Sequence, residues 1–181
     1  MNNPRPEYPR PQFRREQWQC LNGDWQFEID MADSGLERGL LNTPLAGKIN
    51  VPFCPEASLS GIGNQDYLNA VWYRRRVDVP GEWQGEHLLL HFQAVDYDTT
   101  VWVNGEEVGR HRGGFSPFSV ELALSAGDSF ELTVRARDTH TAPQPRGKQA
   151  ISFHGLGAVY CRTTGIWQSV WMEPVPASRL D

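Results

Sequence analysis

The chain has 181 residues, a formal net charge of −5 and 39% hydrophobic residues. That is enough for one globular domain with a sizeable core, and it argues against a nucleic-acid partner, because phosphate binding needs a basic face. The chain contains no run of 18 apolar residues that could cross a membrane, and its amino terminus lacks the apolar core of a signal peptide. The 3 cysteines include no close-spaced pair that would predict a disulfide framework or a zinc site. We therefore expect a cytoplasmic protein with no metal, no cofactor and no membrane partner.

The amino-terminal region predicts an arm followed by strands. Residues 1–16 are rich in Pro and Arg and are expected to form an extended arm. Residues 18–29 predict two strands paired across Asn22-Gly23, or one strand with a kink there, because apolar side chains alternate after the glycine. Residues 34–41 could form one helical turn, and residues 61–66 are expected to form a loop.

Residues 70–79 are the clearest predicted strand, and a turn over Pro80-Gly81 follows them. Arg75 shares one face of this strand with Val71. If that face is the core, the guanidinium needs a partner, and we predict a buried ion pair with an aspartate or glutamate. The alternative is that Trp72 marks the core face and that Arg75 is solvated.

Further segments show the alternation of apolar and polar residues that is typical of half-buried strands. They are residues 87–93, 97–104, 106–110, 118–124 and 129–137. Asn104-Gly105 separates two of them and predicts a type I′ hairpin, since both residues accept a positive φ. Residues 138–150 predict a long polar loop, and residues 151–153 a short strand.

Residues 166–172 predict the closing strand of the domain. Residues 163–165 are expected to form the bend before it, and Trp167 and Trp171 to anchor it by burying large rings. The run 173–176 then predicts the exit into a linker, because proline cannot continue a hydrogen-bonded ladder. Eight or nine short strands with almost no helix predict an all-β fold, a two-sheet antiparallel jelly-roll sandwich.

Two pairs of ionisable residues have spacings that bear on catalysis and metal binding. Asp96 and Asp98 would share one face of an extended segment and could approach the separation that a retaining glycosidase needs, but aspartates at a strand start usually cap turns. His87 and His91 would lie about 13 Å apart on a strand and could not share a metal ion. Neither pair therefore predicts a site.

Four polar loops carry the residue types that contact sugars, since aromatic rings stack on sugar faces and polar side chains bond hydroxyl groups. They are residues 61–69, 111–118, 144–149 and 160–164. Tyr67 in the first loop and Arg146 in the third are candidate sugar-binding residues. The alternative for each loop is a purely structural role or domain docking.

Several short motifs occur in a fixed order between residues 17 and 175. They are Leu21-Asn22-Gly23-Asp24-Trp25, Val71-Trp72-Tyr73-Arg74-Arg75, Val101-Trp102-Val103-Asn104-Gly105 with Gly109, Gly114 with Pro117-Phe118, and Arg162 with Gly165-Ile166-Trp167 and Val170. As an ordered set they resemble the amino-terminal sugar-binding domain of glycoside hydrolase family 2, the β-galactosidase and β-glucuronidase family.

The resemblance implies a galactose-binding-domain-like sandwich at residues 17–175, between the arm at 1–16 and the start of a linker at 176–181. In such enzymes an immunoglobulin-like domain and a barrel follow, and the barrel carries both catalytic glutamates. A barrel needs about 250 residues, and the chain ends at Asp181. We therefore expect no catalytic residue here and no hydrolysis by this chain alone.

The resemblance also implies that loops of this domain reach the sugar pocket beside the barrel. Asp66 and Asn69 lie in the loop before the strand at 70–79, where relatives reach that pocket. They join Tyr67 and Arg146 as the candidate substrate-binding residues.

Two positions near the closing strand bear on that implication. Some relatives place a carboxylate against the sugar six positions before the glycine at 165, where this chain has Val159. Arg162 fits the family pattern and is expected to brace its loop.

The expected function is that of a non-catalytic sugar-binding and scaffolding domain of a retaining β-glycosidase. Its expected partners are a sugar of the β-galactoside or β-glucuronide type and the other domains of the parent enzyme, which could itself be a homo-oligomer. Two alternatives remain open: a free-standing carbohydrate-binding module with an exposed aromatic platform, and a docking domain with a bare apolar patch and no sugar contact.

Overall fold

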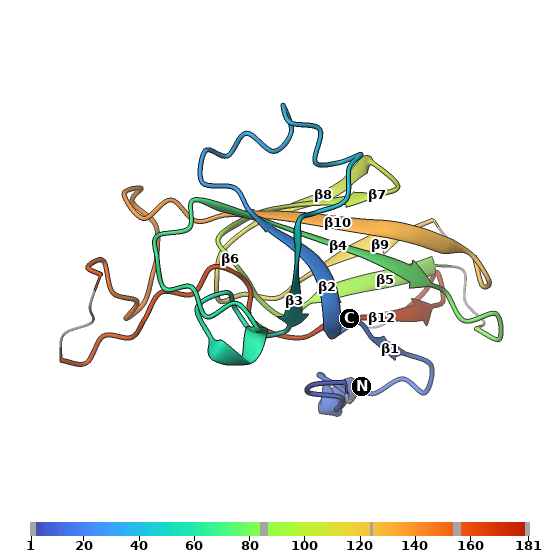
Figure 1. The fold of residues 1–181 in the computed structure, drawn as a ribbon. Coiled ribbons are helices and arrows are strands. Elements are labelled where there is room, and N and C mark those ends of the chain that lie inside the picture. The colour runs from blue at the N-terminus through green and yellow to red at the C-terminus, as the bar shows by residue number, and fades with distance from the viewer. Residues whose placement is uncertain (1–2, 84–86, 124, 154–156, 180–181) are drawn as a thin grey trace.

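Two antiparallel sheets packed face to face make up the computed structural model, which describes residues 3–83, 87–123, 125–153 and 157–179 (Figure 1). The four-stranded sheet contains, in order, β1 (Gln19–Cys20), β12 (Val170–Val175), β5 (His87–Phe92) and β9 (Phe118–Leu122). The six-stranded sheet contains, in order, β3 (Gly47–Val51), β2 (Gly23–Ile29), β4 (Ala70–Asp78), β10 (Ser129–Arg137), β7 (Asp98–Val103) and β8 (Glu106–Arg112).

The remaining elements are short. β6 (Val95–Asp96) and β11 (Gly165–Ile166) form a separate two-stranded ladder, and η1 (Pro11–Phe13) and η2 (Ser58–Ser60) are single 3₁₀ turns. The described residues contain no α-helix, and within them no helix is long and apolar enough to span a membrane. The predicted all-β, two-sheet antiparallel sandwich is confirmed.

The main core lies between the two sheets, and strand alternation builds it. Val71 and Tyr73 of β4 belong to the same buried cluster as Leu90 and Phe92 of β5. Burial of these side chains away from water supplies the main driving force for packing the two sheets. Of the two alternatives for residues 70–79, the face that carries Val71 and Tyr73 is the one in the main core.

The outer face of the six-stranded sheet has a core of its own. Trp72 and Trp102 stack with ring centroids 5.5 Å apart, and Leu40 and Leu45 from the loop above the sheet pack in the same buried cluster. The loop is visible at the top of Figure 1. Residues 34–41, predicted to hold a helical turn, form hydrogen-bonded turns and no helix.

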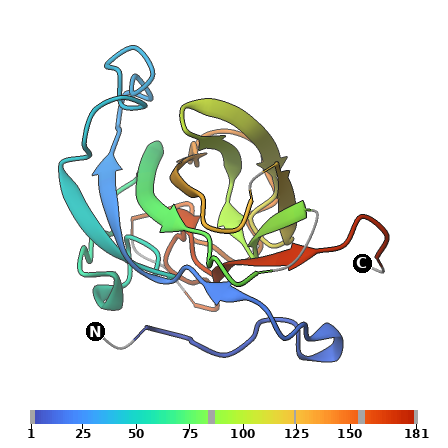
Figure 2. The same cartoon turned by 90° about the vertical axis from the view of Figure 1, so that its right-hand side faces the viewer.

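The amino-terminal arm runs beneath β12 on the outer face of the four-stranded sheet (Figure 2). The Tyr8 ring packs edge-on against Trp171 with centroids 5.1 Å apart. Tyr8 Oη also donates a hydrogen bond to Glu173 Oε2 at 3.0 Å. The arm is therefore held to the domain by a buried aromatic contact and a buried carboxylate.

Residues 18–29 form two strands that do not pair with each other. β1 pairs with β12, whereas β2 pairs with β3 and β4. The chain passes from one sheet to the other at Leu21-Asn22, and Gly23 accommodates the change of direction with a φ of 103°. The predicted pairing across Asn22-Gly23 was wrong, because each strand finds its partner in a different sheet.

The closing segment differs from its prediction in two ways. Residues 166–172 are divided between β11, which pairs with β6, and β12, which pairs with β5. The second strand also continues through Pro174 to Val175. Among the described strands β1 reaches β12 only at Trp171 and Met172, so Pro174 faces an open edge where no N–H donor is needed.

The strand predicted at residues 151–153 is absent from the observed ladders. The Ile151 and Phe153 side chains are 77% and 54% exposed. The prediction was wrong because it rested on apolar composition alone, and no described strand pairs with residues 151–153. In contrast, the Asn104-Gly105 hairpin is confirmed, with φ of 51° and 83° at its two residues.

Arg75 has partners of a different kind from the predicted carboxylate. Its Nη1 donates to the carbonyl oxygens of Leu21 at 2.6 Å and Asn22 at 2.8 Å, and the guanidinium lies 6.0 Å from the Trp25 ring centroid. Among the described residues no acidic side chain forms an ion pair with it. At the backbone crossover between the sheets, two carbonyl oxygens accept hydrogen bonds from this half-buried guanidinium.

Candidate functional site

The loops meet at one end of the sandwich because of the register of the six-stranded sheet. Arg137 at the end of β10 pairs with Ala70 at the start of β4 and with Asp98 at the start of β7. Residues 61–69, which precede β4, and residues 138–150, which follow β10, therefore leave the sheet together at the left-hand end of Figure 1.

Two more loops reach the same end. Asp98 also pairs with Arg112 at the end of β8, so residues 113–117 leave the sheet there. Pairing of β11 with β6 brings residues 157–164 beside them. The four loops flagged in the sequence thus gather at one place, called here the loop end.

A cavity of about 360 Å³ lies among these loops. Its side chains include Phe115, Lys148, Gln149, Tyr160 and Trp167. The rings of Phe115 and Trp167 meet at 72° with centroids 6.1 Å apart. Phe115 and Tyr160 are 56% and 68% exposed, so the cavity presents aromatic faces to solvent.

The cavity can bind a ligand with an apolar face and polar edges. The Lys148 side chain is exposed and forms no ion pair with a described residue, whereas Arg146 pairs with Asp138 at 3.1 Å. Aromatic rings would accept the C–H face of a sugar, and the Lys148 ammonium would donate to a hydroxyl or a carboxylate.

Three buried carboxyl groups lie behind the cavity. Asp96, Asp138 and Glu56 are 1%, 5% and 5% exposed. Burial, with the neighbouring Asp138 charge, raises the pKa of Asp96 to about 7. Burial also raises the pKa of Asp138 and of Glu56.

These acids hold the loops in place. Gln149 Nε2 donates to Asp96 Oδ2 at 2.6 Å, and Gln149 Oε1 accepts from the Thr163 N–H at 2.8 Å. Glu56 Oε2 accepts from the Thr164 N–H at 3.2 Å. The carboxyl groups thus connect the loops at 138–150 and 157–164 to β6 and to the segment before η2.

Asp98 has a different environment from Asp96. Burial would raise its pKa, but hydrogen bonds from Arg112 and Arg137 and their charges lower it. Arg112 Nη2 lies 2.6 Å and Arg137 Nη2 3.1 Å from Asp98 Oδ2. The two aspartates therefore do not act together.

Within the described ranges no group of three or more His, Cys, Asp or Glu side chains is placed to hold a metal ion.

Tyr67 lies at the loop end and has a structural contact on each side. Its hydroxyl donates to the Ile151 carbonyl at 3.1 Å. Its ring lies 4.3 Å from the His140 ring centroid and 4.2 Å from the Arg162 guanidinium. The structure therefore places Tyr67 between two of the loops.

The other candidate residues also lie near the loops. The Asp66 side chain is exposed. Asn69 Nδ2 donates to the Met31 carbonyl at 2.8 Å, away from the cavity. Arg146 lines the cavity, but its guanidinium donates to the carbonyls of Thr139 at 2.5 Å and Ala142 at 2.9 Å as well as pairing with Asp138. Of the four candidates, only Arg146 lines the cavity.

Residues 59–139 match the family described as "Glycosyl hydrolases family 2, sugar binding domain". Residues 59–139 carry a family 2 sugar-binding domain. A β-glucuronidase of Paenibacillus borealis is 33% identical over 123 residues, which are 66% of this chain and 20% of that protein. A β-galactosidase of Thermoanaerobacter pseudethanolicus is 30% identical over 111 residues, 60% of this chain and 14% of that protein.

The fold of the sugar-binding domain is also found in a solved enzyme structure. A β-glucuronidase of Ruminococcus gnavus superimposes with a TM-score of 0.72 at 24% identity, over 94% of this chain and 30% of that chain. The chain spans about 20% of the Paenibacillus relative's length. The resemblance to family 2 drawn from the ordered motifs is confirmed.

Arg162 and Val159, the two positions near the closing strand considered above, differ in burial. Arg162 is 5% exposed; it donates to the Ser152 carbonyl at 2.9 Å and also to the Gln65 carbonyl. It braces the loops, as expected. Val159 is 39% exposed at the loop end, and its apolar side chain brings no charge there.

Sequence reasoning flagged the right loops of the sugar-binding domain but missed most of the cavity's side chains. Phe115, Lys148 and Tyr160 belong to flagged loops, and only the pairing of distant strands brings them together. Trp167 was predicted to anchor the closing strand. It lies in the gap between β11 and β12, half-buried, where its Nε1 donates to the Gly114 carbonyl at 2.8 Å.

Proposed function

We propose that this chain is a non-catalytic sugar-binding and scaffolding domain of a retaining β-glycosidase that acts on a β-galactoside or β-glucuronide. The observation that carries the proposal is the cavity at the loop end of a family 2 sugar-binding domain, where Phe115, Tyr160 and Lys148 are open to a ligand. Aromatic faces and one ammonium group are suited to a sugar.

Burial of the acids supports a non-catalytic role. A retaining glycosidase needs two carboxyl groups about 5–5.5 Å apart that both reach the sugar. Asp96, Asp138 and Glu56 are at most 5% exposed and accept hydrogen bonds from the loops that they hold. Reaching a sugar would require those loops to open.

The other domains of a parent glycosidase, an immunoglobulin-like domain and a barrel, are the proposed protein partners. Ile151, Phe153 and Val159 support this, since their apolar side chains are 77%, 54% and 39% exposed beside the cavity. We also propose a cytoplasmic location, in keeping with free Cys20, Cys54 and Cys161.

Titration of the ¹⁵N-labelled chain with methyl β-galactoside and methyl β-glucuronide, followed by NMR, tests the proposal. We expect shifts of loop-end amides with a Kd of about 1–10 mM, that is near −4 kcal/mol at the tight limit. Phe115→Ala should weaken binding several-fold. Phe13→Ala is the matched control, because Phe13 on the arm is 58% exposed against 56% for Phe115.

Two results would contradict the proposal. One is hydrolysis of a nitrophenyl β-glycoside by the purified chain, with a specific activity that further purification does not lower. The other is the lack of any loop-end shift at about 50 mM sugar, well above the expected Kd.

A docking domain without sugar contact is the second candidate function. The exposure of Ile151 and Phe153 favours it. It predicts self-association of the isolated chain as the concentration rises, weakened by Ile151→Ser, together with no response to sugar. Sedimentation velocity distinguishes it from the first proposal when combined with the titration.

A further inference from the structure

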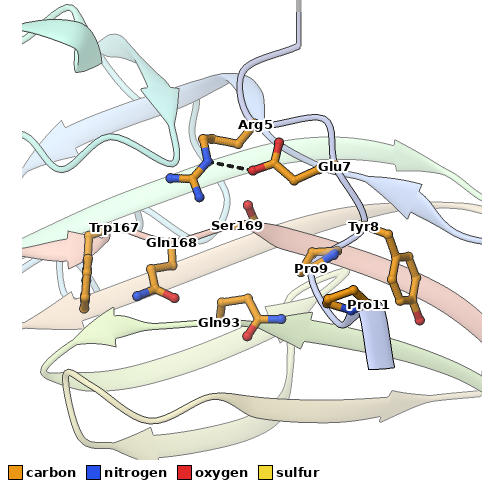
Figure 3. A pocket seen from close by; sticks show the side chains of 9 residues that line it. All are labelled: Arg5, Glu7, Tyr8, Pro9, Pro11, Gln93, Trp167, Gln168 and Ser169. Atoms are coloured by element: carbon orange, nitrogen blue, oxygen red, sulfur yellow. Dashed lines mark hydrogen bonds and ion pairs between the residues drawn. The ribbon is translucent and has the colours of Figure 1, made fainter. Parts of the chain in front are cut away.

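A second cavity, of about 460 Å³, lies between the amino-terminal arm and the segment that enters β12 (Figure 3). One wall is formed by arm residues 5–11, and the opposite wall by Gln93 and residues 167–169. Its volume lies within the range of small-molecule sites, about 300–1,000 Å³. We call this cavity the arm groove.

Two buried polar side chains fasten the arm, one on each side of the arm groove. Asn22 is 3% exposed; its Nδ2 donates to the Pro4 carbonyl at 3.0 Å and to Ser169 Oγ at 3.0 Å. Farther along the arm, Glu173 accepts from Tyr8 at 3.0 Å and from Arg15 at 2.6 Å. Hydrogen bonds thus hold the arm wall of the groove at both ends, so the fold itself defines the shape of the groove.

The arm backbone adopts an uncommon conformation at the groove. Arg5 has a φ of 51°, in the left-handed region that costs a residue with a side chain about 1 kcal/mol or more. Asn22 Nδ2 holds the Arg5 carbonyl at 3.3 Å. Such a conformation persists only where the surroundings enforce it, and functional sites are among the places where it clusters.

The polar groups of the arm groove suit an uncharged ligand. Arg5 and Glu7 pair with each other at 2.8 Å, so they add no net charge. The amides of Gln93 and Gln168 lie across the centre of the groove (Figure 3), and neither makes a hydrogen bond to a described side chain or backbone group. An amide offers a donor and an acceptor together, which matches neighbouring hydroxyl groups.

Apolar surfaces flank these amides. The Trp167 indole closes one end of the groove, and the Pro9 and Pro11 rings lie toward the other (Figure 3). Trp167 also lines the loop-end cavity, so one indole separates the two cavities. A ligand with both hydroxyl groups and C–H faces would satisfy the amides and the rings together.

We propose that the arm groove binds a neutral saccharide, as a carbohydrate site separate from the loop-end cavity. The two glutamine amides bind vicinal hydroxyl groups, and the Trp167 and proline surfaces cover the C–H faces of the sugar. The site does not depend on the proposed function of the loop end, because apart from Trp167 the two cavities share no lining residue.

Lactose, a neutral disaccharide, is the probe for the arm groove, with free glucuronate as the anionic comparison. The 181-residue chain is labelled with ¹⁵N, and the side-chain amide signals of Gln93 and Gln168 are followed during titration. We expect both signals to shift with lactose and to saturate at millimolar concentrations, and to shift much less with glucuronate.

Variants assign the site. Gln168→Ala and Gln93→Ala should each weaken lactose binding about fivefold, the effect of losing one net hydrogen bond. Gln65→Ala is the matched control, since Gln65 is an exposed glutamine outside the arm groove. Lys148→Ala, which removes the ammonium group of the loop-end cavity, should leave the Gln93 and Gln168 shifts unchanged.

Three results would overturn the proposal: an unchanged lactose affinity in both glutamine variants, lactose shifts confined to the loop end, or no shift at about 50 mM, a concentration far above a millimolar Kd. Gln168 is exposed, so Gln168→Ala decides the matter if Gln93→Ala disturbs the fold. Loop-end binding that fails while arm-groove binding persists would refute only the proposed function.

Discussion

Two buried carboxylates, Glu173 at the arm and Asp96 at the loop end, have pKa values shifted in opposite directions. They are 0% and 1% exposed. For Glu173, burial would raise the pKa, but hydrogen bonds from His91 and Tyr8 and the charge of Arg15 lower it. For Asp96, burial and the Asp138 charge raise the pKa to about 7, and its hydrogen-bond donor is the neutral Gln149.

The difference lies in the partners and not in the depth of burial. At the arm a cation compensates the carboxylate, so the ionised form belongs to the folded state. At the loop end three acids are buried together, so ionisation opposes folding. The arm contact therefore stabilises the fold near neutral pH, whereas the loop end holds titratable groups behind a cavity, as functional sites often do.

Gly165→Ala should have the largest effect, because it would force the loop end away from the sheet. Gly165 has a φ of 73°, and a Cβ there would overlap the Tyr73 hydroxyl and the Val71 side chain. We expect a loss of about 3 kcal/mol or more of unfolding free energy, measured by urea denaturation.

Gly127→Ala is the matched control for that substitution. Gly127 has a φ of 85° with nothing within 4 Å of the added Cβ. Only the left-handed backbone then opposes alanine, at about 1 kcal/mol. Equal losses in the two variants would contradict the close packing of Gly165 on Tyr73.

Asp96→Asn should stabilise the chain at neutral pH, because it removes the free-energy cost of ionising a buried acid at the loop end. The folded pKa of Asp96 is raised from 3.8 to about 7, so its contribution to stability is full below pH 3.8 and is lost as the pH rises to about 7. Relative to the unaltered chain, the variant should gain on the order of 3 kcal/mol between pH 4 and 7.

Urea denaturation at several pH values between 4 and 8 measures this gain. Asp138 and Glu56 have raised pKa values as well, so part of the pH dependence should remain in the variant. A stability difference that stays constant over this range would show that Asp96 is not the group that titrates.

Glu173→Gln should show the opposite sign. The folded pKa of Glu173 is lowered below 4.5, so its contribution is present above pH 4.5 and is lost as the pH falls through the folded pKa. We expect a loss of about 1–2 kcal/mol at pH 7, because Arg15 loses its charged partner, and a smaller loss at pH 3.5.

Glu121→Gln provides the comparison on the surface. Glu121 pairs with His87 and Arg179 but is 45% exposed, so its loss should cost less than about 0.5 kcal/mol. If Glu121→Gln and Glu173→Gln destabilise the chain equally, the buried contact at the arm contributes no more to the free energy of unfolding than a surface ion pair.

Arg75→Met should have a smaller effect than the substitutions at Gly165, Asp96 and Glu173. The substitution keeps the packing volume near Trp25 but leaves the Leu21 and Asn22 carbonyls without their donor. We expect a loss of about 1 kcal/mol. Unchanged or increased stability would mean that these two hydrogen bonds do not stabilise the fold.

The fold could be predicted as far as local patterns decide it. Alternation of side chains places Val71 and Tyr73 in the core, and the turn chemistry of Asn104-Gly105 determines its hairpin. The prediction failed at residues 166–172, where two sheets compete for one apolar segment. It failed also at residues 151–153, whose apolar side chains have no strand to pair with.

The site could be predicted only as a set of loops. Which loops meet depends on the pairing of Arg137 with Ala70 and Asp98, and the raised pKa of Asp96 depends on neighbours that are distant in sequence. By itself the sequence determined the fold class, the family and the loops that carry polar and aromatic residues, because side-chain period and turn chemistry are local. Only the tertiary structure decided which side chains line the two cavities and which buried acids are compensated, because both follow from long-range strand pairing.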